Sequence, residues 1–168
     1  MVVFNCNRCN DGVGYLKNRL NIQELSTDNE RNLFHHSAKH DFYLKLGQQA
    51  LDDRVSFDMY TASVTAVESI DLASMSKVVQ FTGGDLVYYS KFNAQKHGEK
   101  LYYDLFRNLT KTYGADVSIK ARCSTGLTVT DYFGSFGFKE AVDFKLSSID
   151  ADKSFCFSLR NDSKFTEG

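Results

Sequence analysis

The alternation of apolar and polar residues over 116–138 predicts two β-strands joined by a tight turn. The apolar positions of the first strand are Val117, Ile119, Ala121 and Cys123, and its polar positions are Ser118, Lys120, Arg122 and Ser124. On the return strand, Leu127, Val129, Asp131 and Phe133 fall on one side, and Thr128, Thr130 and Tyr132 fall on the other. A period of two residues is typical of a strand with one buried face. Because Gly126 can adopt a positive φ at no steric cost, a turn over 124–126 and a β-hairpin are expected.

The rest of the chain alternates between strand and helix patterns before this hairpin. Strands are expected at 1–4, 55–61, 86–89, 117–123, 127–133 and 155–159, and helices at 41–51, 67–78 and 94–113. Asp41 suits the N-cap of the first helix, and Gly114 suits the C-cap of the last. The polar segment 5–39 is interpreted as a long loop. A strand that begins directly at position 1 suggests a fragment of a larger domain.

The element order predicts an α/β protein with two parts. Strands and helices alternate up to Gly114, which indicates a sheet covered by helices. Strand patterns alone follow, which indicates an antiparallel β-sandwich. We therefore expect a first domain over 1–114 and a β-sandwich segment over 115–168.

Composition narrows the classes of function. Of the 168 residues, 42% are hydrophobic and 24% are charged, as in an ordinary soluble globular protein. The formal net charge of −1 gives no global attraction to nucleic acid or to an anionic membrane. The apolar runs are too short to span a membrane, and the N-terminus lacks the order of a signal peptide. The cytosol is therefore the expected compartment, and nucleic acid is not an expected partner.

The polar face of the first predicted strand carries a local pair of cations. Lys120 and Arg122 are two residues apart, so their side chains leave a strand on the same side. Two parallel cations on a rigid element form a candidate site for an anion. A solvated strand face remains the alternative interpretation of the same pattern.

Candidate metal and catalytic motifs are short and lack their companions. Cys6 and Cys9 form a single Cys-x-x-Cys pair, which needs two further ligands to make a structural zinc site. His35, His36 and His40 could supply the missing ligands of a metal site. Free thiols and solvated histidines are the alternative interpretation of the same residues. The Ser-x-x-Lys motif from Ser74 to Lys77 matches one motif of serine acyl enzymes, but the companion motifs of that enzyme class are missing. No catalytic residue or metal ligand is therefore assigned, which favours a binding module over an enzyme.

Several motifs, in a shared order and spacing, resemble the cargo-adaptor subunit of the inner COPII vesicle coat (the Sec-twenty-four family). They are Ile-Asp-Leu-Ala-Ser-Met at 70–75, Phe-Thr-Gly-Gly-Asp-Leu-Val-Tyr-Tyr at 81–89, Phe-Asn at 92–93, Arg-Cys-Ser-Thr-Gly-Leu at 122–127 and Asp-Tyr-Phe-Gly-Ser-Phe at 131–136. The similarity extends from about Val2 to about Lys164. It implies the C-terminal part of a von Willebrand factor A-like trunk followed by a β-sandwich, which together form a middle fragment of the family's chain.

The resemblance also implies a function. In the family, a basic pair on the strand entering the β-sandwich binds acidic export signals in cargo tails, and Lys120 and Arg122 match that pair. Lys120 departs from the usual arginine, and its ammonium cannot form the planar, bidentate fork of a guanidinium. The family's zinc finger has no counterpart here, so no cofactor is expected in this fragment.

Partners and location follow from the same resemblance. The implied partners are the sister inner-coat subunit in a heterodimer, the cytosolic tails of membrane cargo and SNAREs, and the endoplasmic reticulum membrane through the full coat. The implied location is the cytoplasmic COPII coat at endoplasmic reticulum exit sites. Two alternatives within or near the family are the sister subunit that stimulates a small GTPase, and a von Willebrand A-type metal-dependent adhesion domain. The adhesion domain requires an Asp-x-Ser-x-Ser strand end, which the sequence lacks.

Overall fold

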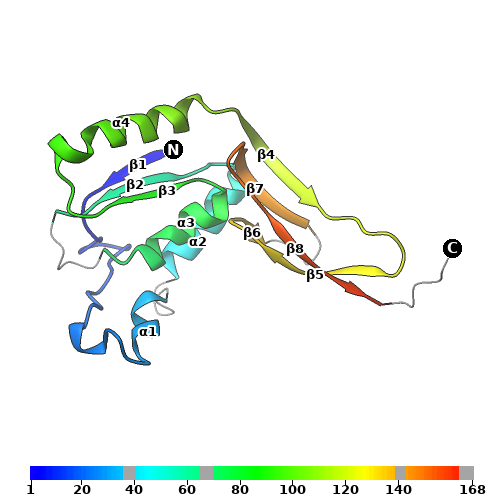
Figure 1. Cartoon of the computed structure of the whole chain (residues 1–168), viewed down its shortest axis with the longest axis horizontal. Helices are drawn as coiled ribbons and strands as arrows, with labels where there is room; N and C mark the ends of the chain where they lie inside the picture. The colour runs from blue at the N-terminus through cyan, green and yellow to red at the C-terminus, as the bar shows by residue number, and fades with distance from the viewer. Residues whose placement is uncertain (36–40, 65–69, 139–142, 163–168) are drawn as a thin grey trace.

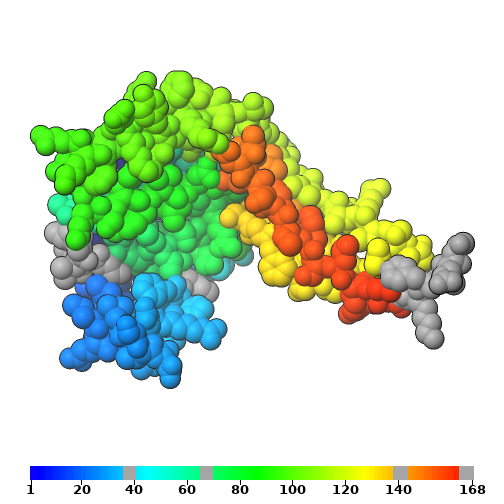
Figure 2. Space-filling model, viewed as in Figure 1, coloured from blue at the N-terminus to red at the C-terminus, as the bar shows by residue number. Residues whose placement is uncertain are grey.

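The computed structural model describes residues 1–35, 41–64, 70–138 and 143–162, which form a helix-covered sheet and a narrower arm of strands (Figures 1 and 2). The parallel strands β1 (Val2–Asn5), β2 (Asp58–Ala62) and β3 (Leu86–Tyr89) lie side by side in that order. One face is covered by α2 (Phe42–Asp52) and α3 (Leu72–Thr82), and the other by α4 (Ala94–Thr110) (Figure 1). A parallel sheet with helices on both faces confirms the α/β prediction for this part.

Alternation along β2 explains why helices cover both faces of the sheet. Met59 faces the core beneath α2 and α3, whereas the Tyr60 hydroxyl donates a hydrogen bond to the Asp104 carbonyl oxygen on α4 (3.4 Å). The buried members of the core on the α2 and α3 side are Leu16, Tyr43, Met59, Ile70, Met75, Val78 and Val79. Met59 of β2 belongs to this core and Leu86 of β3 packs against it, so the core holds both strands in place.

Helix α2 approaches α3 closely at Gly47, and α3 is capped at both ends. A Cβ atom at Gly47 would lie 3.1 Å from the Lys77 carbonyl oxygen, so only glycine allows this approach without displacement. Asp71 caps the start of α3 by accepting a hydrogen bond from the Ser74 backbone N–H (3.3 Å). Gly83, with a φ of 77°, ends α3 in the left-handed conformation.

Most predicted elements exist, and their boundaries move for identifiable reasons. The predicted helix 67–78 begins only at Leu72, and 67–69 lie outside the described residues. The predicted strand 55–61 begins at Asp58, because the Phe57 N–H donates to the Thr82 hydroxyl (3.1 Å) instead of joining the ladder. The predicted helix 94–113 ends at Thr110. Gly114 is therefore not its C-cap and instead belongs to the next strand.

The polar segment 5–39 is mainly loop where it is described. It contains a short 3-10 helix, η1 (Ile22–Glu24), and one helical turn, α1 (Glu30–Phe34). Leu16, which is only 1% exposed, anchors it to the core, and Arg19 pairs with Asp71 at 2.6 Å. No helix in the described part of the chain is both long and apolar enough to cross a membrane.

The arm consists of two antiparallel sheets packed face to face. One contains β4 (Tyr113–Lys120), β7 (Asp143–Asp150) and β6 (Gly137–Phe138), with β7 in the middle, and the other pairs β5 (Leu127–Phe133) with β8 (Cys156–Asn161). Their shared core is built on Phe136, Phe144 and Leu146, with Val117, Ile119, Tyr132, Phe155 and Phe157 packed against it. This arrangement confirms antiparallel sandwich strands after the first part. The sequence analysis missed β6 and β7.

The predicted hairpin of 117–123 with 127–133 is wrong. The turn itself exists, since the Leu127 N–H donates to the Ser124 carbonyl oxygen (3.1 Å) and Gly126 has a φ of 93°. However, β4 pairs with β7 and β5 pairs with β8, so the turn connects the two sheets of the sandwich. A register shift between Val129 and Asp131 also changes which residues of β5 face the core. Tyr132 therefore packs against the sandwich core, and the strict alternation expected along this strand is broken at the register shift.

Candidate functional site

The predicted cationic pair lies at the end of β4 that points away from the parallel sheet. Val117 and Ile119 pack against the sandwich core, so the alternating residues Ser118 and Lys120 are exposed on the opposite face. Lys120 is the last residue of β4, and Arg122 follows in the segment that leads to the turn, where it is also exposed. The structure therefore puts both side chains on the surface. Their role as a cargo-signal site stays a prediction.

The two cations differ in their surroundings. Arg122 makes no hydrogen bond or ion pair with any residue that the structure describes. Lys120 stands opposite Asp143 in the β4–β7 register, at the outer end of the ladder. An anionic group approaching this end of β4 can therefore contact both cations without displacing the sandwich core.

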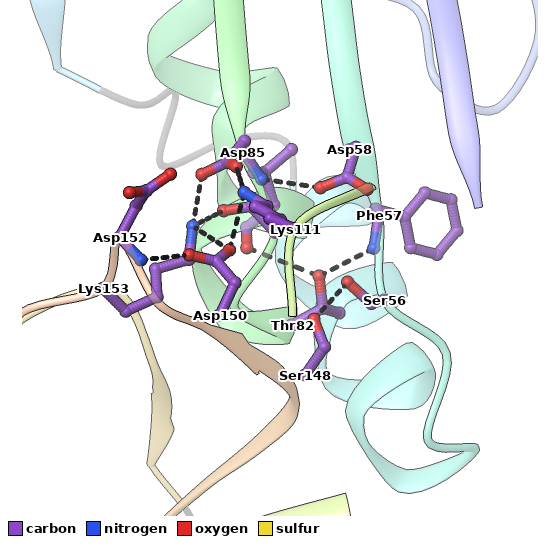
Figure 3. A network of polar contacts seen from close by, with 12 residues as sticks. Ser56, Phe57, Asp58, Thr82, Asp85, Lys111, Ser148, Asp150, Asp152 and Lys153 are labelled. Atoms are coloured by element: carbon purple, nitrogen blue, oxygen red, sulfur yellow. Dashed lines mark hydrogen bonds and ion pairs between the residues drawn. The ribbon is translucent and has the colours of Figure 1, made fainter. Parts of the chain in front are cut away.

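The structure reveals a second charged cluster that the sequence analysis did not find, here called the junction cluster and formed by Asp85, Lys111, Asp150 and Lys153 (Figure 3). The Lys111 ammonium lies 2.5 Å from Asp85 Oδ2 and 2.8 Å from Asp150 Oδ2. Lys153 Nζ donates to the Gly84 carbonyl oxygen (2.9 Å) and also pairs with the Asp85 carboxylate. Two cations thus share two carboxylates, and the cluster is neutral overall.

Burial makes the junction cluster stronger than a surface ion pair. The Asp150 side chain is 8% exposed, and those of Lys111 and Lys153 are 13% and 12% exposed. Burial alone would raise the pKa of the Asp150 carboxyl, but the hydrogen bond from Lys111, the Asp152 backbone N–H and the Lys153 charge outweigh it and lower that pKa. Burial would also lower the pKa of the Lys111 ammonium, but its hydrogen bonds to Asp150 and Asp85 outweigh this and raise it. Asp150 and Lys111 therefore each favour the charged form in the folded protein.

The junction cluster connects the two parts of the molecule. Asp85 immediately precedes β3, Lys111 caps the end of α4, and Asp150 and Lys153 come from the end of β7 and the turn after it. At the surface, Arg107 extends this contact by donating two hydrogen bonds to the Asp152 carboxylate, from Nε to Oδ2 (3.1 Å) and from Nη2 to Oδ1 (2.7 Å). The cluster thus fixes the sheet that carries Lys120 against the parallel sheet.

The Thr-Gly-Gly sequence at 82–84 is part of this junction rather than a phosphate loop. The Thr82 hydroxyl accepts from the Phe57 N–H and donates to the Val78 carbonyl oxygen (2.9 Å). A Cβ atom at Gly83 would lie 2.3 Å from the Ser148 carbonyl oxygen, and one at Gly84 would lie 1.8 Å from the Phe57 carbonyl oxygen. Both glycines are therefore required by backbone packing against β7 and the start of β2.

The metal candidates are not brought together where the structure describes them. Cys9 Sγ donates to the Asp11 carbonyl oxygen (3.0 Å), and His35 Nε2 accepts from Arg31 (3.3 Å). His36 and His40 lie outside the described residues. Among the residues described, no group of three or more His, Cys, Asp or Glu side chains could hold a metal ion.

The acyl-enzyme candidate is explained by helix packing. Ser74 is only 2% exposed and lies in the first turn of α3, where its backbone N–H bonds the capping Asp71. The Lys77 ammonium donates to Gln80 (2.9 Å). A buried serine at this position offers no access for an acyl substrate.

A cavity of about 350 Å³ opens at the carboxyl ends of the parallel strands, beneath α4. It is lined by Phe4, Asn5, Cys6, Tyr60, Ala62, Tyr89, Phe92 and Leu101. This lining is mainly apolar and contains neither a carboxylate nor an imidazole. The cavity therefore lacks the usual pair of groups for acid–base chemistry.

Comparison with known proteins gives a consistent set of matches. A family model described as the Sec23/Sec24 trunk domain matches residues 1–109. The human protein transport protein Sec24C is 29% identical over 154 residues, which are 92% of this chain and 14% of that protein. SEC24 B of Arabidopsis thaliana is 35% identical over 105 residues, which are 62% of this chain and 10% of that protein.

A yeast relative and a solved structure extend these matches. SED5-binding protein 3 of Saccharomyces cerevisiae is 31% identical over 144 residues, 86% of this chain and 15% of that protein. The crystal structure of the human COPII-coat protein Sec24c superposes with a TM-score of 0.84 at 26% identity, covering 99% of this chain and 22% of that one. The chain thus spans between 10% and 15% of the length of these three relatives.

Proposed function

Because the chain belongs to the Sec23/Sec24 trunk family, we propose that it is part of a cargo adaptor of the inner COPII coat. In this proposal it binds acidic sorting signals in the cytosolic tails of membrane cargo during transport from the endoplasmic reticulum to the Golgi. The observation that carries the proposal is the exposure of Lys120 and Arg122 at the outer end of β4. Lys120 projects from a strand whose other face is held by the sandwich core, and Arg122 follows it in the segment that leads to the turn, so the strand end positions the site.

The strength expected of such a site fits a coat protein. One exposed ion pair contributes about 0.2–1 kcal/mol. Two pairs with some apolar burial reach roughly the 4 kcal/mol of millimolar binding. A coat that presents many copies on a membrane can offset weak single contacts through avidity. The site therefore suits transient capture of tails.

The remaining parts of the proposal concern domains, partners and chemistry. We place the domain boundary near Gly114, a region supported by the end of α4 at Thr110 and the start of β4 at Tyr113, although Gly114 itself already belongs to β4. The proposed partners are the sister inner-coat subunit and the tails of cargo and SNARE proteins, and the name of the yeast SED5-binding relative supports a binding role. The protein acts without catalysis and without a cofactor in this fragment, in the cytoplasmic coat at endoplasmic reticulum exit sites.

Replacing both cations tests the proposed site. Lys120→Glu combined with Arg122→Glu should raise the Kd for an acidic peptide about tenfold or more, because two attractions become repulsions. Titration followed by NMR chemical shifts of the full chain measures this, and circular dichroism checks that the fold is retained. Lys96→Glu, at an exposed position on α4, is the control and should leave the Kd unchanged.

Two results would contradict the proposal. Equal affinities of the wild type and the double variant would remove Lys120 and Arg122 from the site. Loss of peptide binding after treatment with a metal chelator would contradict a cofactor-free site. The sister-subunit alternative requires the chain to accelerate GTP hydrolysis by a small GTPase, which a hydrolysis assay measures directly.

A further inference from the structure

Strand β1 forms an open edge of the parallel sheet. Among the described strands it pairs only with β2, so its other edge has no neighbouring strand (Figure 1). The Asp58 N–H donates to the Met1 carbonyl oxygen (2.8 Å), which therefore points toward β2. Because backbone groups alternate in direction along a strand, the N–H and C=O groups of Val2 and Phe4 point outward. Both residues thus offer a donor and an acceptor to an added strand.

Helix α4 has a charged flank toward β3 and an apolar flank toward β1. Lys100 and Arg107 line a cavity together with residues of β3, which fixes the direction of the charged flank. On the other flank, Tyr102, Phe106 and Leu109 follow one another at helical spacings. The rings of Tyr102 and Phe106 stack with their centroids 6.2 Å apart. Leu109 lines a second cavity together with the first residues of the chain, so the apolar flank runs beside β1.

The exposed apolar side chains along this edge form one surface, here called the edge patch. Its members are Met1, Phe4, Tyr102, Phe106, Leu109 and Tyr113, whose exposed fractions lie between 53% and 71%. Because a large aromatic side chain carries about 150–250 Å² of surface, the exposed parts of the patch amount to roughly 600 Å². Apolar patches of this size on soluble proteins usually mark an interaction site.

The edge patch contains no charged side chain that would oppose a copy of itself. Residues 1–5 are uncharged along their side chains, and the N-terminal ammonium is bound by the Ser56 carbonyl oxygen. Strand β3, in contrast, begins beside the junction cluster, and charged side chains next to a sheet edge disfavour strand addition. The edge of β1 is therefore the more suitable of the two for pairing, and its surface is self-complementary.

We propose that two copies of this chain associate through the edge patch, with their β1 strands paired antiparallel. A two-fold axis at Val3 pairs Val2 of one copy with Phe4 of the other, which satisfies the outward backbone groups of both strands. The axis is perpendicular to the sheet, so both α4 helices stay on the same face and their apolar flanks meet. The dimer covers roughly 1,200 Å² of exposed side-chain surface, at the lower end of specific interfaces.

This interface is separate from the proposed cargo-signal site. Lys120 and Arg122 lie at and beyond the outer end of β4, whereas the edge patch follows β1 and α4. The Lys120→Glu, Arg122→Glu variant should therefore dimerise as the wild type does. Peptide titration tests the cargo-signal site and sedimentation tests the dimer, so either proposal can fail without the other.

Sedimentation equilibrium of the full chain, from about 1 to about 200 µM, covers the affinities expected of an interface of this size. Phe106→Glu and Leu109→Glu should each raise the dimer Kd about tenfold or more, because each buries a charge without a partner. Leu159→Glu is the matched control, since Leu159 is similarly exposed (56%) but lies on β8, outside the patch. It should leave the dimer Kd unchanged. Circular dichroism checks that each variant is folded.

Amide hydrogen exchange tests the pairing of the two β1 strands. The Phe4 N–H points outward, so its exchange should slow about tenfold or more between the lowest and the highest protein concentration. The Val3 N–H turns toward β2 within one copy, and its exchange is the internal reference. Helix contacts alone would leave both amides unchanged by concentration.

Each result supports or overturns the proposal. A wild type that stays monomeric over the whole range leaves the edge patch to a different partner, and the proposal fails. A mass that continues to grow beyond two copies shows non-specific association and also contradicts a closed two-fold dimer. Equal Kd values for the patch variants and the control place the contact on another surface. A dimer without slower Phe4 exchange rules out the paired β1 strands.

Discussion

At the scale of single residues, Gly83 shows how the junction constrains the sequence. Its φ of 77° and the 2.3 Å between a Cβ atom and the Ser148 carbonyl oxygen both exclude a side chain. Gly83→Ala should therefore lower the free energy of unfolding by at least about 1–3 kcal/mol, the usual cost of a strained backbone. Urea unfolding followed by circular dichroism measures this change.

Gly98 provides the matched control within the same chain. It lies in the interior of α4, and a Cβ atom there would meet no atom within 4 Å. Gly98→Ala should raise the free energy of unfolding by about 0.5–1 kcal/mol, because alanine loses less backbone entropy in a helix. If both variants shifted stability in the same direction and by the same amount, close packing at Gly83 would not be the cause.

At the scale of elements, the junction cluster joins β3, α4 and β7 through buried charges. Asp150→Asn removes one of the two carboxylates that neutralise Lys111 and Lys153. We expect a loss of about 2–4 kcal/mol in the free energy of unfolding, because two largely buried cations would then share the single carboxylate of Asp85. Asp152→Asn removes the exposed partner of Arg107 and should change stability little. A similar small effect of both variants would contradict a structural role for the cluster.

Local sequence patterns predicted most helices and strands, but they did not predict which strands pair with each other. The turn at Gly126 was found from its residues, but its strands pair with β7 and β8, which lie further along the chain. Strand β7 itself was missed, although the buried Phe144 and Leu146 alternate with Lys145 and Ser147. Contacts between distant segments decide such pairing, and a single local period does not encode them.

In the candidate site too, features carried by one element were predicted from the sequence, and contacts between distant elements were not. The surface position of Lys120 followed from alternation on one strand, because Val117 and Ile119 had to face a core, whereas Arg122 lies just after the strand ends. The junction cluster required three separate segments to meet, at the start of β3, the end of α4 and the end of β7. The sequence therefore indicated the part of the site that one element carries and no more.

At the scale of the whole molecule, the resemblance seen in the sequence is confirmed by the family model over residues 1–109 and by the fold of human Sec24c. The parallel sheet and the sandwich have separate cores, one around Met75 and Val78 and one around Phe144 and Leu146. Charged contacts at the junction cluster contribute to holding these cores together. The orientation of Lys120 relative to the parallel sheet therefore depends on groups that titrate.

The stability of the whole molecule should consequently depend on pH at both extremes. The pKa of Asp150 is lower in the folded protein, so its contribution is complete above the unfolded value of 3.8 and is lost as the pH falls through the folded pKa. The pKa of Lys111 is raised, so its contribution is complete below 10.5 and is lost as the pH rises through the folded pKa. Unfolding free energies measured by urea titration across pH should thus fall on the acid side in the wild type, and less in Asp150→Asn. An equal acid slope in both proteins would show that other carboxylates control the acid response and that the junction cluster does not.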